Sequence, residues 1–404
     1  MDATAGQPGL PAMTDVKLPR IAYVTTYDER DLHAWSGVVH TIAGCLVSAG
    51  FELDMIGMSE PATLRTKALK LAWRAAGAQL LRDREPLVTK GFGAQAMKRL
   101  KTVDHDLIFS PGTVAIAHIQ TPKPIVYWTD STFDGMVDYY PAFTGLSRRT
   151  LRNGHALEQS ALDRCSLALF PSQWAVNSAI ENYRVDPSKL QVVPFGSNVA
   201  DPPSHDEVLA AIDRREPEPC ELLWVGADWE RKGGEVAFAA AEAMNRAGVR
   251  THLQVVGARP PRPLPDFVKV HGFISRHDPA GREQLADLYT RAHFAVGPSD
   301  AETFGVAFAD ACCYGVPVLA ADTGGVGDNV RNGVNGHLLP QGASGEAYAH
   351  MALDILKDPN EYRRLASGAR NEYATRLNWG SAGAHVRQLI TELSVSTSGP
   401  TLGS

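Results

Sequence analysis

The sequence has few of the features that mark secreted, membrane-spanning or nucleic-acid-binding proteins. It contains five cysteines and no CxxC pair, and their odd number and apolar surroundings predict reduced, buried thiols in a cytosolic protein. No apolar run reaches the about 18 residues that a spanning helix needs, so a transmembrane segment is not expected. Acidic residues outnumber basic ones and give a net charge of −6. This argues against a nucleic-acid binder, because such proteins are usually basic.

The composition is otherwise that of a globular protein. Hydrophobic residues make up 44% and charged residues 21% of the chain. A chain of 404 residues is too long for one hydrophobic core, so two domains are expected. Residues 1–19 lack the basic and then apolar pattern of a signal peptide. We expect a flexible lead there and a flexible tail at residues 396–404.

The most informative stretch lies between Phe294 and Pro340. Its pattern predicts a strand over residues 294–296, a helix over 305–314 and a second strand over 318–321. Each strand runs into a loop that contains glycine, and the first of these loops also carries Glu302. Ligands bind at the carboxyl ends of the strands in an open parallel sheet, so these loops are candidates for a binding site.

The same alternation of strand and helix occurs in both halves of the chain. Expected strands cover residues 20–26, 51–56, 106–109, 124–128, 167–170 and 190–196 in the first half, and 221–226, 253–256 and 268–274 in the second. A proline-rich, charged segment separates the halves at residues 198–219. This organisation predicts an α/β protein with two doubly wound domains, residues 20–197 and 220–378.

Two polar segments in the first half follow strands. Gly37 precedes a helix expected over residues 38–49, where free N–H groups could hold a phosphate, although a plain tight turn also fits. Thr129-Asp130-Ser131-Thr132-Phe133 follows a buried strand and is either part of a site or a helix cap formed by Asp130 or Ser131. The segment Asp138-Tyr139-Tyr140-Pro141 would extend the same surface.

Basic residues form two further features. Arg231 and Lys232 lie between a strand that ends at Gly226 and a following helix. They could clamp a diphosphate, because arginine offers a fork of donors and lysine a compact charge, or they could form a solvated basic loop. Residues 64–84 are amphipathic with a basic face, which is either a solvated helix side or a contact with an anionic acceptor or a membrane surface.

Five short motifs follow one another in the second half of the chain. They are Gly226…Lys232-Gly233, His271-Gly272-Phe273-Ile274, Gly297-Pro298-Ser299…Glu302…Gly305, Gly315-Val316-Pro317-Val318…Gly324-Gly325 and Asn335-Gly336. Together they resemble the C-terminal domain of retaining glycosyltransferase family 4, which has the GT-B fold. The resemblance covers roughly residues 21–379 and is strongest over residues 222–339.

The resemblance implies two Rossmann-like domains that face each other across a cleft. The first, completed by a C-terminal helix at residues 379–395, would bind the acceptor, and the second would bind the nucleotide sugar. The implied activity is that of a retaining, metal-independent hexosyltransferase. It would move a sugar from a nucleotide-diphosphate sugar to a hydroxyl acceptor by front-face displacement. No cofactor is implied, and the acceptor would be a saccharide, a lipid-linked molecule or a small molecule.

The family pattern also assigns roles to residues. Those expected in catalysis are Arg231, Lys232, Glu302 and Asp130, and those expected to bind the donor are Gly37, Gly226, Ile274, Phe304, Gly305, Val306 and Asp310. Lys232 would bind the diphosphate, and Glu302 would accept hydrogen bonds from sugar hydroxyls. Asp310 would hold the ribose, and its spacing of eight residues from Glu302 would place both on one side of a helix.

The chain departs from the family pattern at three positions. Asp310 replaces a glutamate, and Ala227 stands where the family has an arginine, so Arg231 is the natural substitute. Asp130 occupies the place of a first-domain histidine. Two alternatives stay open. A GT-B-like nucleotide-sugar epimerase would use the same nucleotide pocket, and the departures also allow a non-catalytic nucleotide-sugar binding protein. A cytoplasmic location is expected, with peripheral contact to the inner membrane face through residues 64–84 as an option.

Overall fold

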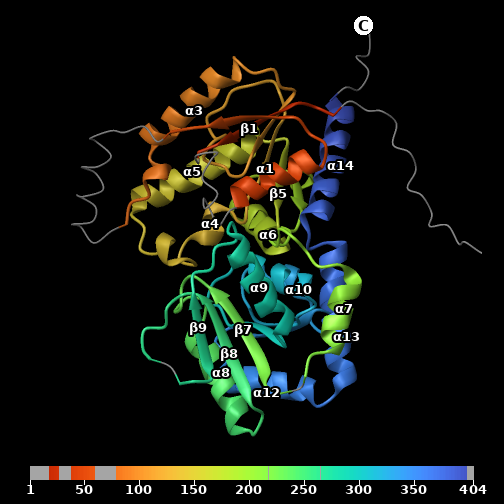
Figure 1. The fold of residues 1–404 in the computed structure, drawn as a ribbon. Helices are drawn as coiled ribbons and strands as arrows, with labels where there is room; N and C mark the ends of the chain where they lie inside the picture. Colours follow the sequence, from red (N-terminus) through yellow and green to blue (C-terminus); the bar gives the residue numbers. More distant parts are fainter. Residues whose placement is uncertain (1–17, 27–37, 60–78, 217, 264, 398–404) are drawn as a thin grey trace, which may run out of the picture.

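The computed structural model describes residues 18–26, 38–59, 79–216, 218–263 and 265–397. Within these ranges the chain forms two α/β domains, one above the other in Figure 1. Each domain contains a six-stranded sheet whose strands all run parallel. The two-domain α/β expectation is therefore confirmed.

The first sheet has the strand order β2-β1-β3-β4-β5-β6. Its strands are β1 (Ile21–Thr25), β2 (Leu53–Gly57), β3 (Leu107–Ser110), β4 (Ile125–Trp128), β5 (Leu167–Phe170) and β6 (Leu190–Val192). Strands β1, β3, β4 and β5 are buried along their whole length, as expected for a parallel sheet covered on both faces. The helices around them are α1 (Val38–Ser48), η2 (Arg82–Arg84), α3 (Pro86–Leu100), α4 (Phe133–Met136), η3 (Pro141–Phe143), α5 (Arg148–Arg164), α6 (Gln173–Asn182) and η4 (Pro187–Lys189).

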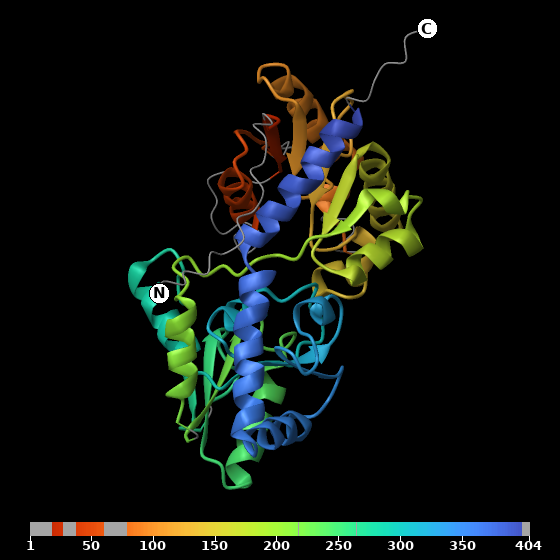
Figure 2. The ribbon, with the colours of Figure 1, turned by 90° about the vertical axis from the view of Figure 1, so that its right-hand side faces the viewer.

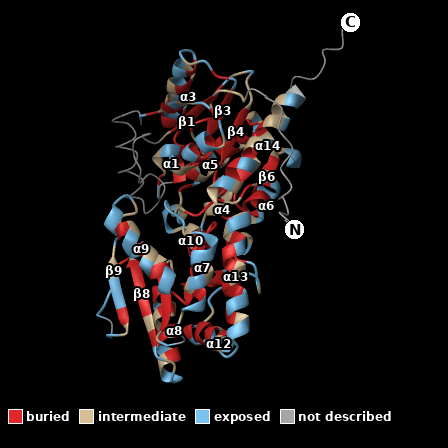
Figure 3. Cartoon of the chain, turned by 45° about the vertical axis from the view of Figure 1, so that its right-hand side comes forward, coloured by how far each residue is buried: buried red, intermediate tan, exposed pale blue. Residues whose placement is uncertain are grey.

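The second sheet has the strand order β12-β11-β10-β7-β8-β9. Its strands are β7 (Cys220–Gly226), β8 (Thr251–Gly257), β9 (Val268–Gly272), β10 (Phe294–Gly297), β11 (Val318–Asp322) and β12 (Gly336–Pro340). The helices in the second half of the chain are α7 (His205–Asp213), α8 (Gly234–Arg246), α9 (Pro279–Arg291), α10 (Val306–Cys313), α11 (Val326–Asn329), α12 (Gly345–Leu356), α13 (Pro359–Thr375) and α14 (Trp379–Thr397). Figure 3 shows buried strands inside both domains and exposed residues along the outer helices.

Local sequence signals explain where several helices begin. Ser147, Ser172 and Ser344 each precede a helix and accept a hydrogen bond from the backbone N–H three residues later. Ser204 and Glu207 form a complete capping box at the start of α7. These caps satisfy N–H groups that have no partner inside the helix, so the helix starts are defined by sequence.

Two segments connect the domains. Residues 198–204 run from the first domain to α7, which packs against α13 of the second domain. At the other end of the chain, α13 and α14 follow each other along both domains (Figure 2). Helix α14 packs on α1, where the Cys45 thiol donates to the Trp379 carbonyl at 3.2 Å and Arg387 Nη1 donates to the Ala49 carbonyl at 3.1 Å. The C-terminal helix thus lies against the first domain.

Several expectations fall outside the described residues. They are the lead at residues 1–17, the loop that holds Gly37, residues 64–78 of the amphipathic segment, and the tail at 398–404. A membrane contact of the amphipathic segment stays a prediction. In the ranges that are described, no helix combines the length and apolar character needed to cross a bilayer.

Candidate active site

The candidate site lies at the carboxyl edge of the second sheet, between β7 and β10. These two strands are neighbours, and the chain continues from them in opposite directions, to β8 and β9 on one side and to β11 and β12 on the other. Such a reversal opens a crevice between the two loops that follow the central strands. Here these are residues 227–233, which carry Arg231 and Lys232, and residues 298–305, which carry Glu302.

The first loop is held by its own polar groups and by a glycine. Asp228 Oδ1 accepts from the Arg231 N–H at 3.1 Å, and the Asp228 carbonyl accepts from the Lys232 N–H at 3.1 Å. Gly233 has φ 68°, and a Cβ at this position would lie 2.0 Å from the Pro298 carbonyl oxygen. Glycine is therefore required here, because only a residue without Cβ lets the two loops come together.

Lys232 and Glu302 form an ion pair across the crevice. Lys232 Nζ contacts Glu302 Oε2, and the side chains are 18% and 10% exposed. Burial lowers the pKa of Lys232, and the positive charge of Arg231 lowers it further, while Asp228 opposes the shift. The surroundings of Lys232 thus disfavour its charged form, and the Glu302 carboxylate beside it neutralises the charge.

Arg231 points toward the first domain. Its Nη1 donates to the Ala301 carbonyl at 2.7 Å, and its Cζ lies 5.2 Å from the centre of the Tyr140 ring. The side chain is 20% exposed and lies 3.8 Å from Asp228 Oδ2. Arg231 therefore lies beside the pair of Lys232 and Glu302, but part of its hydrogen-bonding capacity is used to hold the second loop.

The first domain closes on the loop that carries Glu302. The Glu302 N–H donates to Tyr139 Oη at 2.8 Å, and the Thr303 N–H donates to Tyr140 Oη at 3.1 Å. Thr303 Oγ1 donates to Asp130 Oδ2 at 3.2 Å, which brings the end of β4 into the same cluster. The polar segments around Asp130 and Tyr139 thus do extend one surface, and that surface meets Glu302.

The start of α10 presents its backbone at the same edge. Gly305 has φ 82° and precedes Val306, the first residue of the helix. The Asn329 amide donates to the carbonyls of Phe304 and Gly305, at 3.0 and 2.8 Å. The Phe304 side chain is buried against Phe195 of the first domain, with ring centres 5.8 Å apart. The backbone near residues 304–306 is therefore fixed from both domains.

Asp310 does not share a helix face with Glu302, so that part of the prediction is wrong. Glu302 precedes α10, and Asp310 is fully buried inside it. Its carboxylate accepts from Ser197 Oγ at 2.8 Å and from the Asn198 N–H at 2.7 Å, and pairs with Arg276 Nη1 at 2.8 Å. In this arrangement Asp310 ties the connection between the domains to α10. A role in holding ribose stays a prediction.

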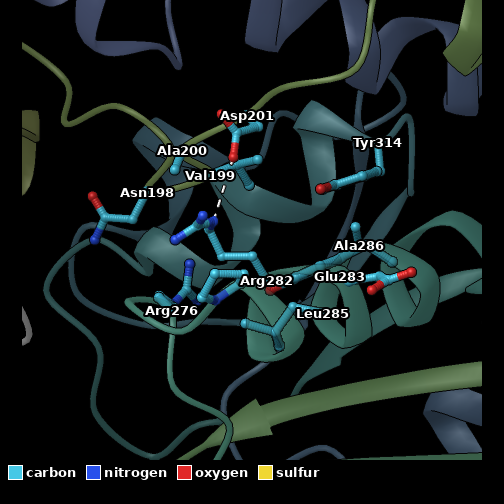
Figure 4. A pocket seen from close by; sticks show the side chains of 12 residues that line it. Asn198, Val199, Ala200, Asp201, Arg276, Arg282, Glu283, Leu285, Ala286 and Tyr314 are labelled. Atoms are coloured by element: carbon cyan, nitrogen blue, oxygen red, sulfur yellow. Dashed lines mark ion pairs between the residues drawn. The ribbon is translucent and has the colours of Figure 1, made fainter.

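Two cavities lie beside this connection. One, of about 830 Å³, opens between α1 and residues 273–277 and is lined by Ile274 and Arg276, among others. The other, of about 270 Å³, lies on the far side of Arg276 between residues 198–201 and α9; it contains the ion pair of Arg282 and Asp201 (Figure 4). Ile274 thus faces the larger cavity, and its donor-binding role stays a prediction. Gly226 ends β7 close to Lys232, whereas Gly37 lies outside the described residues.

Several residues at the site were not found by sequence reasoning. Thr303, Arg276, Ser197 and Asn329 all contact predicted site residues, yet none is among the residues that define the motifs. Their partners lie far away in sequence, so no local signal could have indicated them. Within the described ranges, no group of three or more His, Cys, Asp or Glu side chains is arranged to hold a metal ion.

Comparison with known proteins connects this geometry to a family. Residues 36–201 match the model described as glycosyltransferase family 4, and residues 219–358 match the model described as glycosyl transferases group 1. A D-inositol 3-phosphate glycosyltransferase from Thermobispora bispora is 31% identical over 229 residues, which cover 53% of this chain and 53% of that protein. One from Rhodococcus erythropolis is 31% identical over 212 residues, covering 49% and 47%. The chain thus spans about half the length of the curated relatives it matches.

Solved structures share the fold over nearly the whole chain. Sucrose-phosphate synthase from Thermosynechococcus elongatus superposes with a TM-score of 0.67 at 18% identity, covering 93% of this chain and all of that one. HepE from Anabaena, solved in complex with UDP-glucose, superposes with a TM-score of 0.61 at 17% identity, covering 94% and 100%. At such identities the likeness shows a shared fold, which is GT-B.

Proposed function

The chain belongs to the family 4 type of glycosyltransferases with the GT-B fold, and we propose that it transfers a sugar from a nucleotide-diphosphate sugar to a hydroxyl acceptor. We propose further that transfer retains the anomeric configuration and needs no metal. The observation that carries this proposal is the largely buried ion pair of Lys232 and Glu302 at the switch point of the second sheet. A cation for the diphosphate and a carboxylate for sugar hydroxyls stand next to each other there.

The two partners of this pair suit the two ends of the donor. When a diphosphate binds, Lys232 would leave the Glu302 carboxylate and contact phosphate oxygens instead, and their negative charge would stabilise its positive charge. Glu302 is then free to accept hydrogen bonds from the sugar hydroxyls. Arg231 lies close enough to add a second positive charge to the leaving-group side, because it neighbours Lys232.

The reaction follows from charge. The bond between the anomeric carbon and the phosphate oxygen breaks, and a bond from the acceptor oxygen to the same carbon forms on the same face. Negative charge develops on the leaving diphosphate, which takes up the proton of the acceptor hydroxyl. A preorganised group that stabilises this charge supplies about 3–4 kcal/mol, or about 10²–10³ in rate. The contacts of Asp130, Tyr139 and Tyr140 with the second loop would exclude water from this step.

The named relatives support the class of both substrates. HepE was solved with UDP-glucose, which supports a nucleotide sugar as donor and makes a uracil base the first one to test. The relatives are named for an inositol phosphate acceptor, which supports a polyhydroxyl molecule as the acceptor class.

A thermal-shift panel tests the donor site. UDP, GDP, ADP and TDP are added in turn to the full chain, and the melting temperature is measured. A ligand that binds only the folded state stabilises it by RT ln(1 + [L]/Kd). The nucleotide with the correct base should therefore raise the melting temperature more than the other three do. The sugar nucleotide with that base is then incubated with acceptors in the presence of a chelator. Binding of none of the four nucleotides would contradict the proposed function.

A further inference from the structure

Another cavity lies in the first domain, at the point where the strand order of its sheet reverses. Its volume is about 250 Å³. It is lined by residues 25–26 at the end of β1, 110–115 at the end of β3 and 129–131 after β4, together with residues from η2, α4, η3 and α5. In the first sheet the strand order reverses between β1 and β3, so the cavity occupies the crevice where open α/β sheets bind ligands.

Three buried polar atoms at this cavity have no hydrogen-bond partner among the described residues. They are Glu158 Oε1, Ser131 Oγ and Arg84 Nε, and their residues are 2%, 3% and 7% exposed. Glu158 Oε2 is satisfied, since it accepts from Thr113 Oγ1 at 2.9 Å. Buried polar groups are rarely left unpaired, because each costs about 1–3 kcal/mol. Three such atoms around one cavity point to a polar ligand.

The lining is rich in hydroxyl groups. Hydroxyl side chains come from all three strand ends: Thr25, Thr26, Ser110, Thr113, Thr129 and Ser131. A hydroxyl both donates and accepts, so a wall of this kind matches a ligand that carries several hydroxyls of its own.

The charges at the cavity disfavour an anionic ligand. Asp83, Asp130 and Glu158 line it, and Arg84 is the one cation among the described lining residues. Arg84 Nη1 is already paired with Asp83 Oδ2 at 2.7 Å. Burial raises the pKa of Glu158 to about 7, which leaves a carboxyl that can donate as well as accept near neutral pH. Among the lining residues that the structure describes, a phosphate would therefore meet acidic groups and little uncompensated positive charge.

The cavity adjoins the candidate donor site. Asp130 lines the cavity and also accepts from Thr303 Oγ1, and Thr303 follows Glu302 in the chain. A molecule in the cavity is thus next to the loop that would hold the donor sugar.

We propose that this cavity binds the acceptor as an uncharged polyhydroxyl molecule, and that Glu158 selects it against phosphorylated polyols. Its role as acceptor site rests on the proposed transfer reaction, whereas its ligand preference follows from the lining alone. The preference sets this chain apart from relatives that are named for a phosphorylated inositol.

Saturation-transfer NMR on the full chain tests the preference by binding alone. The probes are myo-inositol and D-glucose, each compared with its phosphomonoester, in the presence of the nucleoside diphosphate that stabilises the protein most. We expect each uncharged polyol to bind at least about tenfold more tightly than its phosphate ester, because the ester brings a negative charge next to the carboxyls that line the cavity. Tighter or equal binding of the esters, or no binding of either polyol, overturns the proposal.

The variant Glu158→Gln tests the selecting residue. It keeps the size of the side chain and removes its charge and its proton, so the preference for the uncharged polyol should fall by about fivefold or more. Glu181→Gln, at an exposed position of α6, is the matched control and should leave the preference unchanged. An unchanged preference in Glu158→Gln overturns the assignment of Glu158. Failure of the proposed function would instead be seen as an absence of nucleotide binding in the thermal-shift panel, regardless of whether the polyols bind.

Discussion

Replacing Lys232 by alanine separates the role of this lysine in catalysis from its role in stability. The change removes the cation proposed to hold the diphosphate and leaves Glu302 without its ion-pair partner. An exposed pair contributes about 0–1 kcal/mol, and breaking a fully buried one costs about 3–5 kcal/mol. The two side chains are 18% and 10% exposed, so the loss of unfolding free energy should fall between these limits, at about 2–3 kcal/mol.

The effect on transfer should be larger than the effect on folding. Removing one preorganised group from the leaving-group side costs about 10²–10³ in kcat. The affinity for the nucleoside diphosphate should fall as well, because the lysine also contacts the ground state. Chemical denaturation measures the stability, isothermal titration the nucleotide affinity, and a coupled assay of released nucleotide the rate.

The double variant Lys232→Ala/Glu302→Gln distinguishes the two effects. Neutralising Glu302 removes the unpaired buried charge, so the double variant should recover part of the lost stability but none of the lost transfer. Lys269→Ala, at an exposed position of β9, is the matched control and should change neither. Full transfer activity in a folded Lys232→Ala protein would refute the proposed diphosphate contact.

Three further predictions concern other parts of the molecule. Gly324→Ala should lower the free energy of unfolding by about 1–3 kcal/mol and reduce transfer, because its Cβ would lie 2.3 Å from the Glu302 carbonyl and 2.4 Å from Tyr139 Oη. Gly333→Ala is the control for the backbone cost, since Gly333 has φ 70° and a Cβ there would meet no atom within 4 Å. An equal loss of stability in the two variants would argue against a steric effect at Gly324. Burial raises the pKa of Glu158 to about 7 in the folded state, so the folded protein binds this proton more tightly than the unfolded chain does. The free energy of unfolding should therefore decrease by about 3 kcal/mol as pH rises from about 4.5 to 7. Denaturation midpoints of Glu158→Gln should lack this pH dependence, and the same pH dependence in both proteins would contradict the raised pKa. Asp310→Asn should lower the free energy of unfolding by about 1–3 kcal/mol, because it weakens the contacts of this side chain with Arg276, Ser197 and Asn198. If Asp310 holds the ribose, Asp310→Asn should bind the nucleotide more weakly than Ser197→Ala does. Equal nucleotide affinities of these two variants would exclude the ribose role.

The alternation of strands and helices made the fold predictable. Strands such as β5 and β10 are continuous apolar runs that stop at turn residues, and their positions match the expected ones closely. Helix α3 was not among the expected elements, and it contains Gly91 and Gly93, which have low helix propensity. Gly93 is nonetheless required there, since a Cβ at this position would lie 2.5 Å from His118 Cβ. Such a packing demand cannot be read from a local pattern.

The site was predictable where motifs carry it and not where the domains meet. Lys232 and Glu302 were assigned from their loops, and the structure brings them together. The environment of the Asp310 carboxylate includes Ser197, which is 113 positions away in the sequence. The cavity around Glu158 depends on the ends of three strands and on four further elements, η2, α4, η3 and α5. Long-range contacts of this kind exist only once the chain has folded.

The anomeric configuration of the product tests the central proposal most directly. The full chain is incubated with the nucleotide sugar selected by the thermal-shift panel, an unphosphorylated polyol and a chelator, and the reaction is followed by proton NMR. We expect a new anomeric signal with the same configuration as the donor, which appears together with free nucleoside diphosphate and persists with the chelator present. A product of opposite configuration, or transfer that stops when metal is removed, would contradict it.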